Sequence, residues 1–370
     1  MITPIIPLTK KYIINGPNNV IRLTNKENKV LYIFGDHHLN ISNQNECFYN
    51  TKYDSLDIDK FLLAFIKSTD KIKYDIFTEM YHDIYTDYDE NYKDKYLNYR
   101  KRYIDNVDKL FQSNIKDKYK NIRFHYTDIR ENLLLYNRLL SFTNIHIFNK
   151  NYTGRVYILL YKELKELIKL FIKLLDKNKY IKKIKKNYNN DEIGNKINEI
   201  YEDIIKHMKY LLSIIKKLIN IINDNIYSKS MNIYSCDINM RHTEKKLNIN
   251  EEILFYSNEI QWIICVIGGI LVDLYFLRRF LDKKYITNAI LYTGCYHMAN
   301  ISYILVKYFD FTITHVNYIT KSIDLNQYIL SLSNNKFEYT KKIADLLVKK
   351  LDNNIIYQCT NLFNFPDNFS

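Results

Sequence analysis

Short apolar runs of strand length alternate with segments of helical apolar spacing along the first 130 residues. A turn-like polar segment separates the first two runs, which is typical of a β-hairpin. In chain order, the pattern predicts strands at Val20–Leu23 and Lys29–Phe34, a helix at Leu56–Ser68, a strand at Tyr74–Glu79, a helix at Asn91–Asn114 and a strand at Arg123–Tyr126. Repeated β-α-β units predict an α/β fold with a largely parallel or mixed central sheet flanked by helices.

The middle of the chain has a different pattern, with long helical stripes from Leu160 to Leu175 and from Ile193 to Ile222. The lysine-rich polar segment 182–190 separates them, so we expect an antiparallel helical hairpin. Strand and helix signals then return. They predict a helix at Glu251–Leu281, a strand at Ala289–Thr293, a helix near Asn300–Tyr308, a strand at Thr312–Val316 and a helix at Tyr339–Lys350. We therefore expect residues 1–150 and 251–370 to form one core, and residues 151–250 to form an inserted helical hairpin region.

Two copies of the motif Gly-x-x-His follow apolar runs that are predicted to be strands. The first runs from Gly35 to His38 and the second from Gly294 to His297. A glycine at the carboxyl end of a strand permits a sharp turn, and open α/β sheets bind ligands at that end. We expect the two histidines to meet in one crevice.

Carboxylates accompany these histidines at the predicted strand ends. Glu79 ends the strand that follows the first motif, and Asp36 lies within that motif. Two imidazoles and a carboxylate can activate a water molecule or bind a divalent metal ion. His38, Glu79 and His297 are therefore candidate catalytic residues and candidate ligands for Mn, Co or Zn. The alternative for each histidine alone is a hydrogen-bonded structural role.

On these motifs the sequence resembles the TraB/TIKI and erythromycin-esterase/ChaN-like proteins. Their shared pattern is an early strand-Gly-x-x-His, a Glu ending the next core strand, an Arg on a later helix and a second strand-Gly-x-x-His. The matching positions here are Gly35 with His38, Glu79, and Gly294 with His297. The resemblance covers about 29–79 and 273–316 and leaves the helical middle unmatched.

The resemblance implies a hydrolase, although its members differ in chemistry. TIKI-like members are metal-dependent proteases, erythromycin-esterase-like members use a histidine as general base on an ester, and ChaN-like members bind haem. We expect paired histidines with Glu79 and Asp36 to activate a water that attacks an ester or amide of a small-molecule or peptide substrate. An arginine would stabilise the oxyanion, and Arg278 suits the family position, with Arg241 as its rival.

Further polar residues near the predicted strand ends are candidates for substrate binding. This set comprises Gly35, His37, Gly294, Arg241, His125, Asp128 and Arg130. The last three could instead form a satisfied polar network. Cys295 is a candidate nucleophile, but a reactive thiol needs an exposed, electropositive setting that the sequence does not indicate.

The chain is basic, with 54 Lys and Arg against 41 Asp and Glu. Such a balance can indicate binding to nucleic acid or to an anionic membrane. Acidic residues are interleaved throughout, however, and no nucleic-acid-binding motif accompanies the charge, so nucleic acid is not the expected partner. The alternative function is a non-catalytic protein that engages nucleic acid or a protein partner through its basic helical hairpin.

The five cysteines are widely spaced and include no C-x-x-C pair. This pattern indicates neither a disulfide framework nor a thiolate zinc site and fits the reducing interior of a cell. Residues 1–16 lack the apolar core of a signal peptide, and the apolar run Trp262–Val272 is short of the ~20 residues that cross a bilayer. We expect a cytoplasmic or otherwise intracellular protein without a membrane span, and the oligomeric state stays open.

Overall fold

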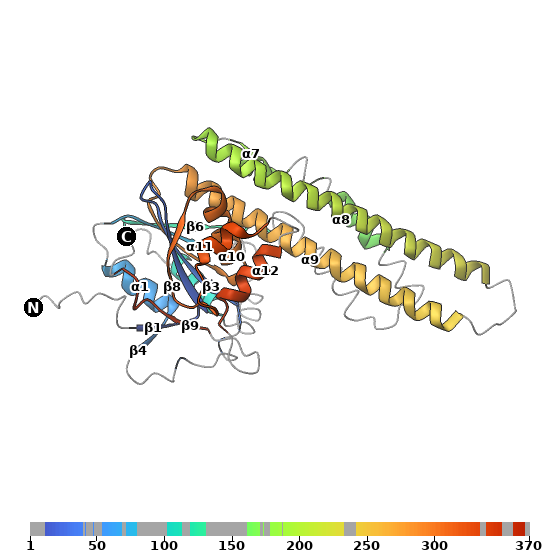
Figure 1. The fold of residues 1–370 in the computed structure, drawn as a ribbon, viewed down its shortest axis with the longest axis horizontal. Coiled ribbons are helices and arrows are strands. Elements are labelled where there is room, and N and C mark those ends of the chain that lie inside the picture. Colours follow the sequence, from blue (N-terminus) through green and yellow to red (C-terminus); the bar gives the residue numbers. More distant parts are fainter. Residues whose placement is uncertain are drawn as a thin grey trace, which may run out of the picture. The chain divides into compact units, whose positions relative to one another are not determined.

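The computed structural model describes residues 12–39, 41, 47, 54–68, 72–79, 102–112, 119–130, 161–170, 173, 178–186, 188–232, 242–333, 338–349 and 358–366. The chain divides into two compact units. The first comprises Met1–Asp128 with Arg279–Ser370, and the second comprises Ile129–Arg278. In the described residues, the strands lie in the first unit, whereas the second is helical (Figure 1). The predicted α/β class is confirmed.

Six strands form the main sheet of the first unit. Their spatial order is β6 (Ile122–Tyr126), β5 (Tyr74–Thr78), β7 (Asn288–Gly294), β3 (Val30–Asp36), β2 (Asn19–Thr24) and β8 (Thr312–Val316). The first four are mutually parallel, and β2 is antiparallel to both of its neighbours. Because central parallel strands are covered on both faces, they have nearly continuous apolar sequences, as β3 does from Val30 to Phe34.

The register of the central strands determines which residues share one edge of the sheet. Asp36 at the end of β3 pairs with Gly294 at the end of β7. On the other side of β7, Thr78 pairs with Tyr292, so the residue after β5 emerges beside them. Parallel strands present their carboxyl ends at the same edge. The ends of β3, β5 and β7 therefore lie next to one another.

Helices cover both faces of this sheet. On one face, α1 (Ile58–Ser68) and α3 (Tyr103–Gln112) pack onto alternate residues of β3 and β7 and form a continuous apolar core that includes Phe34, Phe61 and Tyr292. Figure 1 shows α10 (Cys295–Tyr308), α11 (Leu325–Ser331) and α12 (Glu338–Leu347) on the side opposite α1. The predicted boundaries of α1 and α12 agree to within three residues, whereas α10 begins at Cys295, directly after β7, rather than near Asn300. The predicted helix Asn91–Asn114 contains α3, and its first part, 91–101, lies outside the described residues.

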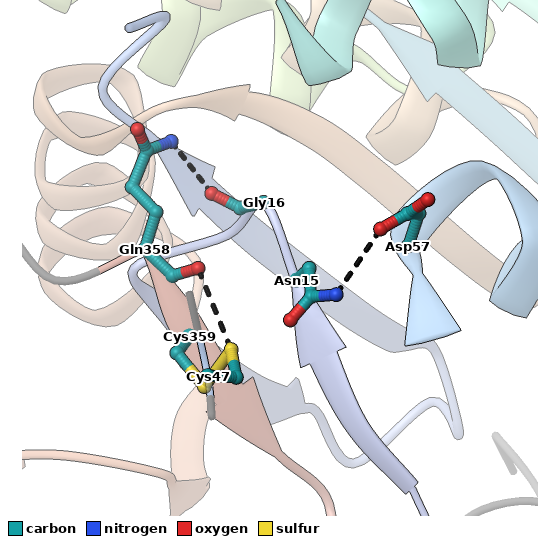
Figure 2. Close-up of a disulfide and its surroundings, with 6 residues drawn as sticks. All are labelled: Asn15, Gly16, Cys47, Asp57, Gln358 and Cys359. Atoms are coloured by element: carbon teal, nitrogen blue, oxygen red, sulfur yellow. Dashed lines mark hydrogen bonds between the residues drawn. A yellow bond between two sulfur atoms is a disulfide. The ribbon is translucent and has the colours of Figure 1, made fainter. Parts of the chain in front are cut away.

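A second, three-stranded sheet was not predicted from the sequence. Its order is β4 (Asp54–Asp57), β1 (Tyr12–Asn15) and β9 (Cys359–Asn361), with β9 antiparallel to β1. A disulfide joins Cys47 to Cys359 across 312 residues of sequence (Figure 2). The expectation that the widely spaced cysteines do not pair is therefore wrong, because folding brings segments far apart in the sequence together.

The second unit contains a long antiparallel helical pair. It is formed by α8 (Asp191–Asn232) and α9 (His242–Asp282), with Tyr210 donating a hydrogen bond to Glu259 at 2.8 Å and Lys217 contacting Tyr256. The lysine-rich segment expected as a linker is partly helical, because Asn178 caps α7 (Lys179–Lys185) with two hydrogen bonds. Of the two helices predicted for the hairpin, the second, Ile193–Ile222, lies within α8, and its antiparallel partner in this pair is α9.

One helical segment, Phe255–Asp282, is long and apolar enough to cross a membrane by length and composition. Of its most apolar 18-residue window, 61% is buried inside the protein, as is usual for a core helix. This burial agrees with the interpretation of Trp262–Val272 as a buried helix.

Candidate functional site

Glu79, the residue after β5, lies between the two histidines of the Gly-x-x-His motifs. Its Oε1 atom is 3.0 Å from His297 Nε2, and its Oε2 atom is 3.4 Å from His38 Nε2. The structure thus brings together the three residues that the sequence singles out. They come from the ends of three neighbouring strands, as the register of β3, β5 and β7 requires.

The Glu79 carboxylate is held by further donors from β7. Oε2 accepts hydrogen bonds from Thr293 Oγ1 and from the Gly294 backbone N–H, both at 2.8 Å. Gly294 is the N-cap of α10, so the carboxylate lies at the positive end of a helix dipole. Only 5% of Glu79 is exposed. Several donors and a helix N-terminus together stabilise a buried, ionised carboxylate.

Asp36 forms a second carboxylate centre on the other side of His38. It accepts hydrogen bonds from the His38 backbone N–H at 3.0 Å, from Tyr292 Oη at 2.8 Å and from Gln358 Nε2. Its Oδ2 atom is also 3.2 Å from His38 Nδ1. Each ring nitrogen of His38 therefore faces a carboxylate.

This double pairing controls the charge of His38. Burial alone would lower the pKa of its imidazole, but hydrogen bonds to Asp36 and Glu79, together with their negative charges, outweigh burial and raise the pKa from 6.5 to about 9. His38 is therefore an imidazolium at neutral pH. Its side chain is 27% exposed, whereas that of His297 is 10% exposed, so His38 is the more accessible of the two.

The backbone conformation of the motifs differs from the expected glycine turn. Gly294 is extended, with φ −67° and ψ 152°, and it is His38 that adopts the left-handed conformation, with φ 54°. A Cβ atom on Gly294 would lie 3.2 Å from His38 Nε2 and 3.4 Å from Glu79 Oε2. On Gly35 it would lie 2.8 Å from Met298 Cε. These glycines leave room for close packing rather than permitting a turn.

Cys295 lies inside the second motif but does not have the setting of a nucleophile. It is 2% exposed, and burial, with the nearby charges of Asp36 and Glu79, raises the pKa of its thiol well above 9. A thiol with a raised pKa stays protonated at neutral pH and is inert.

His125 belongs to a different polar cluster, at the other end of β5. Its Nε2 atom is 2.7 Å from Asp75 Oδ1, and Arg123 donates two hydrogen bonds to the same carboxylate at 2.8 and 2.6 Å. Asp75 precedes Glu79 by four residues, which is about 13 Å along a strand. Burial lowers the pKa of His125, so a neutral imidazole completes the cluster.

The remaining candidate residues belong to both units of the structure. Asp128 is buried just after β6, and His37 is half-buried after β3. Arg130 and Arg278 belong to the second unit, where Arg130 lies beside Gly268 and the Arg278 guanidinium lies 5.7 Å from the centre of the Tyr188 ring. Arg241 lies outside the described residues.

Three residues of the site were missed by the sequence analysis: Tyr292, Thr293 and Gln358. The first two lie within the strand of the second motif, and their hydroxyl groups in an otherwise apolar run were an available signal. Gln358 follows Asp36 by 322 residues and has no local signal.

The His and Glu side chains of this site are of types that bind divalent metal ions, but in the structure they contact one another. The two Nε2 atoms engage the two oxygens of the Glu79 carboxylate. Within the part of the chain that the structure describes, no group of three or more His, Cys, Asp or Glu residues is placed to hold a metal ion. Metal binding by His38, Glu79 and His297 stays a prediction.

Comparison with known proteins corrects the resemblance. A family model described as "Family of unknown function (DUF5847)" matches residues 12–180 and 171–370, and no TraB or erythromycin-esterase model matches. The resemblance to those hydrolases is therefore wrong. It rested on short motifs, which recur at the strand ends of unrelated α/β proteins. The assignment of Arg278 as the family's arginine rested on this resemblance and is therefore also withdrawn.

The similar proteins are viral. The uncharacterized protein R706 of Acanthamoeba polyphaga mimivirus is 28% identical over an alignment 421 positions long, which covers 96% of each chain. Uncharacterized proteins R160 and R161 of the same virus are 48% and 44% identical over 99 and 98 residues, covering 27% and 26% of this chain and 21% and 20% of theirs. No solved structure matches. The family match spans almost the whole described chain, so the protein belongs to the DUF5847 family of unknown function.

Proposed function

We propose that the protein is a hydrolase that cleaves an ester or amide bond with the residues around Glu79. The observation that carries this proposal is the Glu79 carboxylate, which contacts the Nε2 atoms of both His38 and His297 at the carboxyl edge of the sheet. This edge is where ligands of open α/β sheets bind. An imidazole oriented by a buried carboxylate is a common general base.

The two histidines would have different roles, because their environments differ. His297 is mostly buried, and with Nε2 donating to Glu79 its Nδ1 atom carries the lone pair that can take a proton from water. The resulting hydroxide would attack the carbonyl carbon. Glu79 would then stabilise the imidazolium that forms on His297.

His38 would supply positive charge beside the reacting carbonyl group. Its raised pKa keeps it protonated at neutral pH, and its side chain is partly exposed. Because each ring N–H of His38 faces a carboxylate, its imidazolium would stabilise the negative charge on the carbonyl oxygen through its positive charge. The proton that His297 takes from water would then pass from His297 to the leaving group. Asp36, opposite Glu79, holds the ring in this orientation.

Hydrolysis assays on four proteins test this proposal. The wild type, His38→Asn, His297→Ala and Glu79→Gln are compared on p-nitrophenyl acetate and on fluorescein-labelled casein, with and without Mn²⁺ or Zn²⁺. We expect each variant to lose at least 100-fold in kcat/KM, since general acid–base groups contribute about 10²–10⁴-fold. The matched control is His315→Asn, a histidine on the edge strand β8, which should keep wild-type activity.

The outcomes separate the possible functions. Activity that survives in His297→Ala would refute the assignment of the base. Stoichiometric metal in the wild type, lost in all three site variants, would replace the acid–base scheme with a metal-dependent one. A folded wild type without activity on either substrate would favour the alternative, a binding protein that uses its lysine-rich helices.

A further inference from the structure

Gln358 reaches the site from the far end of the chain. Its side-chain amide Nε2 donates hydrogen bonds to Asp36 Oδ1 and, at 2.6 Å, to the Gly16 carbonyl oxygen. Only 2% of Gln358 is exposed. One buried amide group therefore joins the Asp36 carboxylate to the backbone after β1, and Figure 2 shows its side chain pointing at Gly16.

Backbone contacts fix the position of Gln358. The Gly16 N–H donates to its carbonyl oxygen at 3.1 Å, so the two residues exchange hydrogen bonds. Gly16 has φ 119°, which favours glycine, and a Cβ atom there would lie 2.9 Å from the Tyr103 ring. This turn therefore depends on glycine at position 16.

The residues that follow Gln358 anchor the segment that carries it. The next residue, Cys359, starts β9, which pairs with β1, and forms the disulfide with Cys47 (Figure 2). Further along β9, Asn361 accepts a hydrogen bond from Asn317 at 2.9 Å. A side chain held by a strand pairing, a disulfide and a reciprocal backbone contact is well suited to orient another group.

We propose that Gln358 is a positioning residue, which holds the Asp36 carboxylate against the His38 imidazole. Asp36 Oδ1 accepts from Gln358 while its Oδ2 atom faces His38 Nδ1, so the amide sets the rotation of the carboxylate. An amide suits this task because it donates without adding charge. A glutamate here would repel Asp36, and a lysine would compete with His38 for it. A role of Gln358 in catalysis rests on the proposed function, whereas its effect on the orientation of Asp36 does not.

The test follows the His38 ring directly, without any assay of turnover. Protein labelled with ¹⁵N-histidine is studied by NMR at pH 7, and the His38 signals are assigned by their loss in His38→Asn. Gln358→Met keeps the side-chain length and removes both donors. We expect the His38 Nδ1–H to exchange with solvent at least tenfold faster than in the wild type. Gln327→Met, on the exposed face of α11, is the matched control and should leave the signals unchanged.

A second variant covers the case in which Gln358→Met does not fold. Gln358→Glu keeps the size of the side chain and places two carboxylates together, so it should also move the His38 Nδ1–H signal. The positioning role would be overturned if a Gln358 variant that unfolds at the urea midpoint of the wild type also kept the wild-type exchange rate and chemical shift of the His38 Nδ1–H. If turnover is detected, the positioning variants should lower kcat with little change in KM. If the Gln358 variants change the His38 Nδ1–H signal as expected but the wild type shows no turnover, only the proposed function is refuted.

Discussion

The charge on His38 makes the stability of the fold depend on pH in a defined direction. In the folded protein the pKa is about 9, and in an unfolded chain it is near 6.5. A raised pKa contributes stability that is fully present below pH 6.5 and is lost as the pH rises through 9. The shift corresponds to about 3 kcal/mol of unfolding free energy, at about 1.4 kcal/mol for each pH unit.

The substitution His38→Asn removes this titration with little backbone strain. Asparagine tolerates the left-handed conformation that residue 38 adopts. Urea unfolding, followed by circular dichroism at pH 6, 7, 8, 9 and 10, gives the free energy of both proteins. Other groups titrate in this range, but their effects cancel in the difference between wild type and variant.

We expect the stability advantage of the wild type over His38→Asn to fall by about 3 kcal/mol between pH 6 and pH 10. The control, His315→Asn, should show no such change above pH 7, because burial lowers the pKa of His315 and leaves it neutral there. A wild-type advantage that stays constant to within about 0.5 kcal/mol over the whole range would refute the double carboxylate pairing of His38.

Three further predictions concern glycine and cysteine. Gly294→Ala should push His38 away from Glu79, lower the rate of hydrolysis at least tenfold and cost about 1–3 kcal/mol of unfolding free energy in urea. The control is Gly268→Ala, which should leave activity unchanged because its Cβ would meet nothing closer than 4.0 Å. Thiol titration of denatured, unreduced protein should find two fewer free thiols than titration of the reduced protein. Reducing the disulfide should cost about 2–5 kcal/mol in unfolding free energy. Five free thiols would contradict the disulfide. Iodoacetamide at pH 8 should not label Cys295 until the protein unfolds, and rapid labelling would contradict its burial.

The sequence was sufficient for the central sheet because its strands are buried on both faces. Such strands leave long apolar runs, and β3 and β7 were found to within two residues at each end. The meeting of His38, Glu79 and His297 follows from parallel pairing, which places the ends of neighbouring strands together. These parts of the fold depend on local patterns and on a general rule of topology.

Other features depend on contacts that have no local signature. The strands β1, β4 and β9 have three or four residues each, too few for a periodic pattern. Gln358 and the cysteine partner of Cys47 are specified only by the folded chain. His125 was expected near the catalytic edge because it is late in β6, but Asp75 on the neighbouring strand draws its ring into a buried cluster.

The contact between Asp36 and Gln358 can form only late in synthesis, because Gln358 is made long after Asp36. The two residues are 322 positions apart, and at about 5–20 residues per second roughly 15–65 s separate their appearance on the ribosome. For most of that interval the strand that carries Asp36 lacks β7, its parallel neighbour in the sheet. The first unit therefore has to finish folding after most of the chain has been made, and β3 is exposed until then to the mispairing that chaperones suppress.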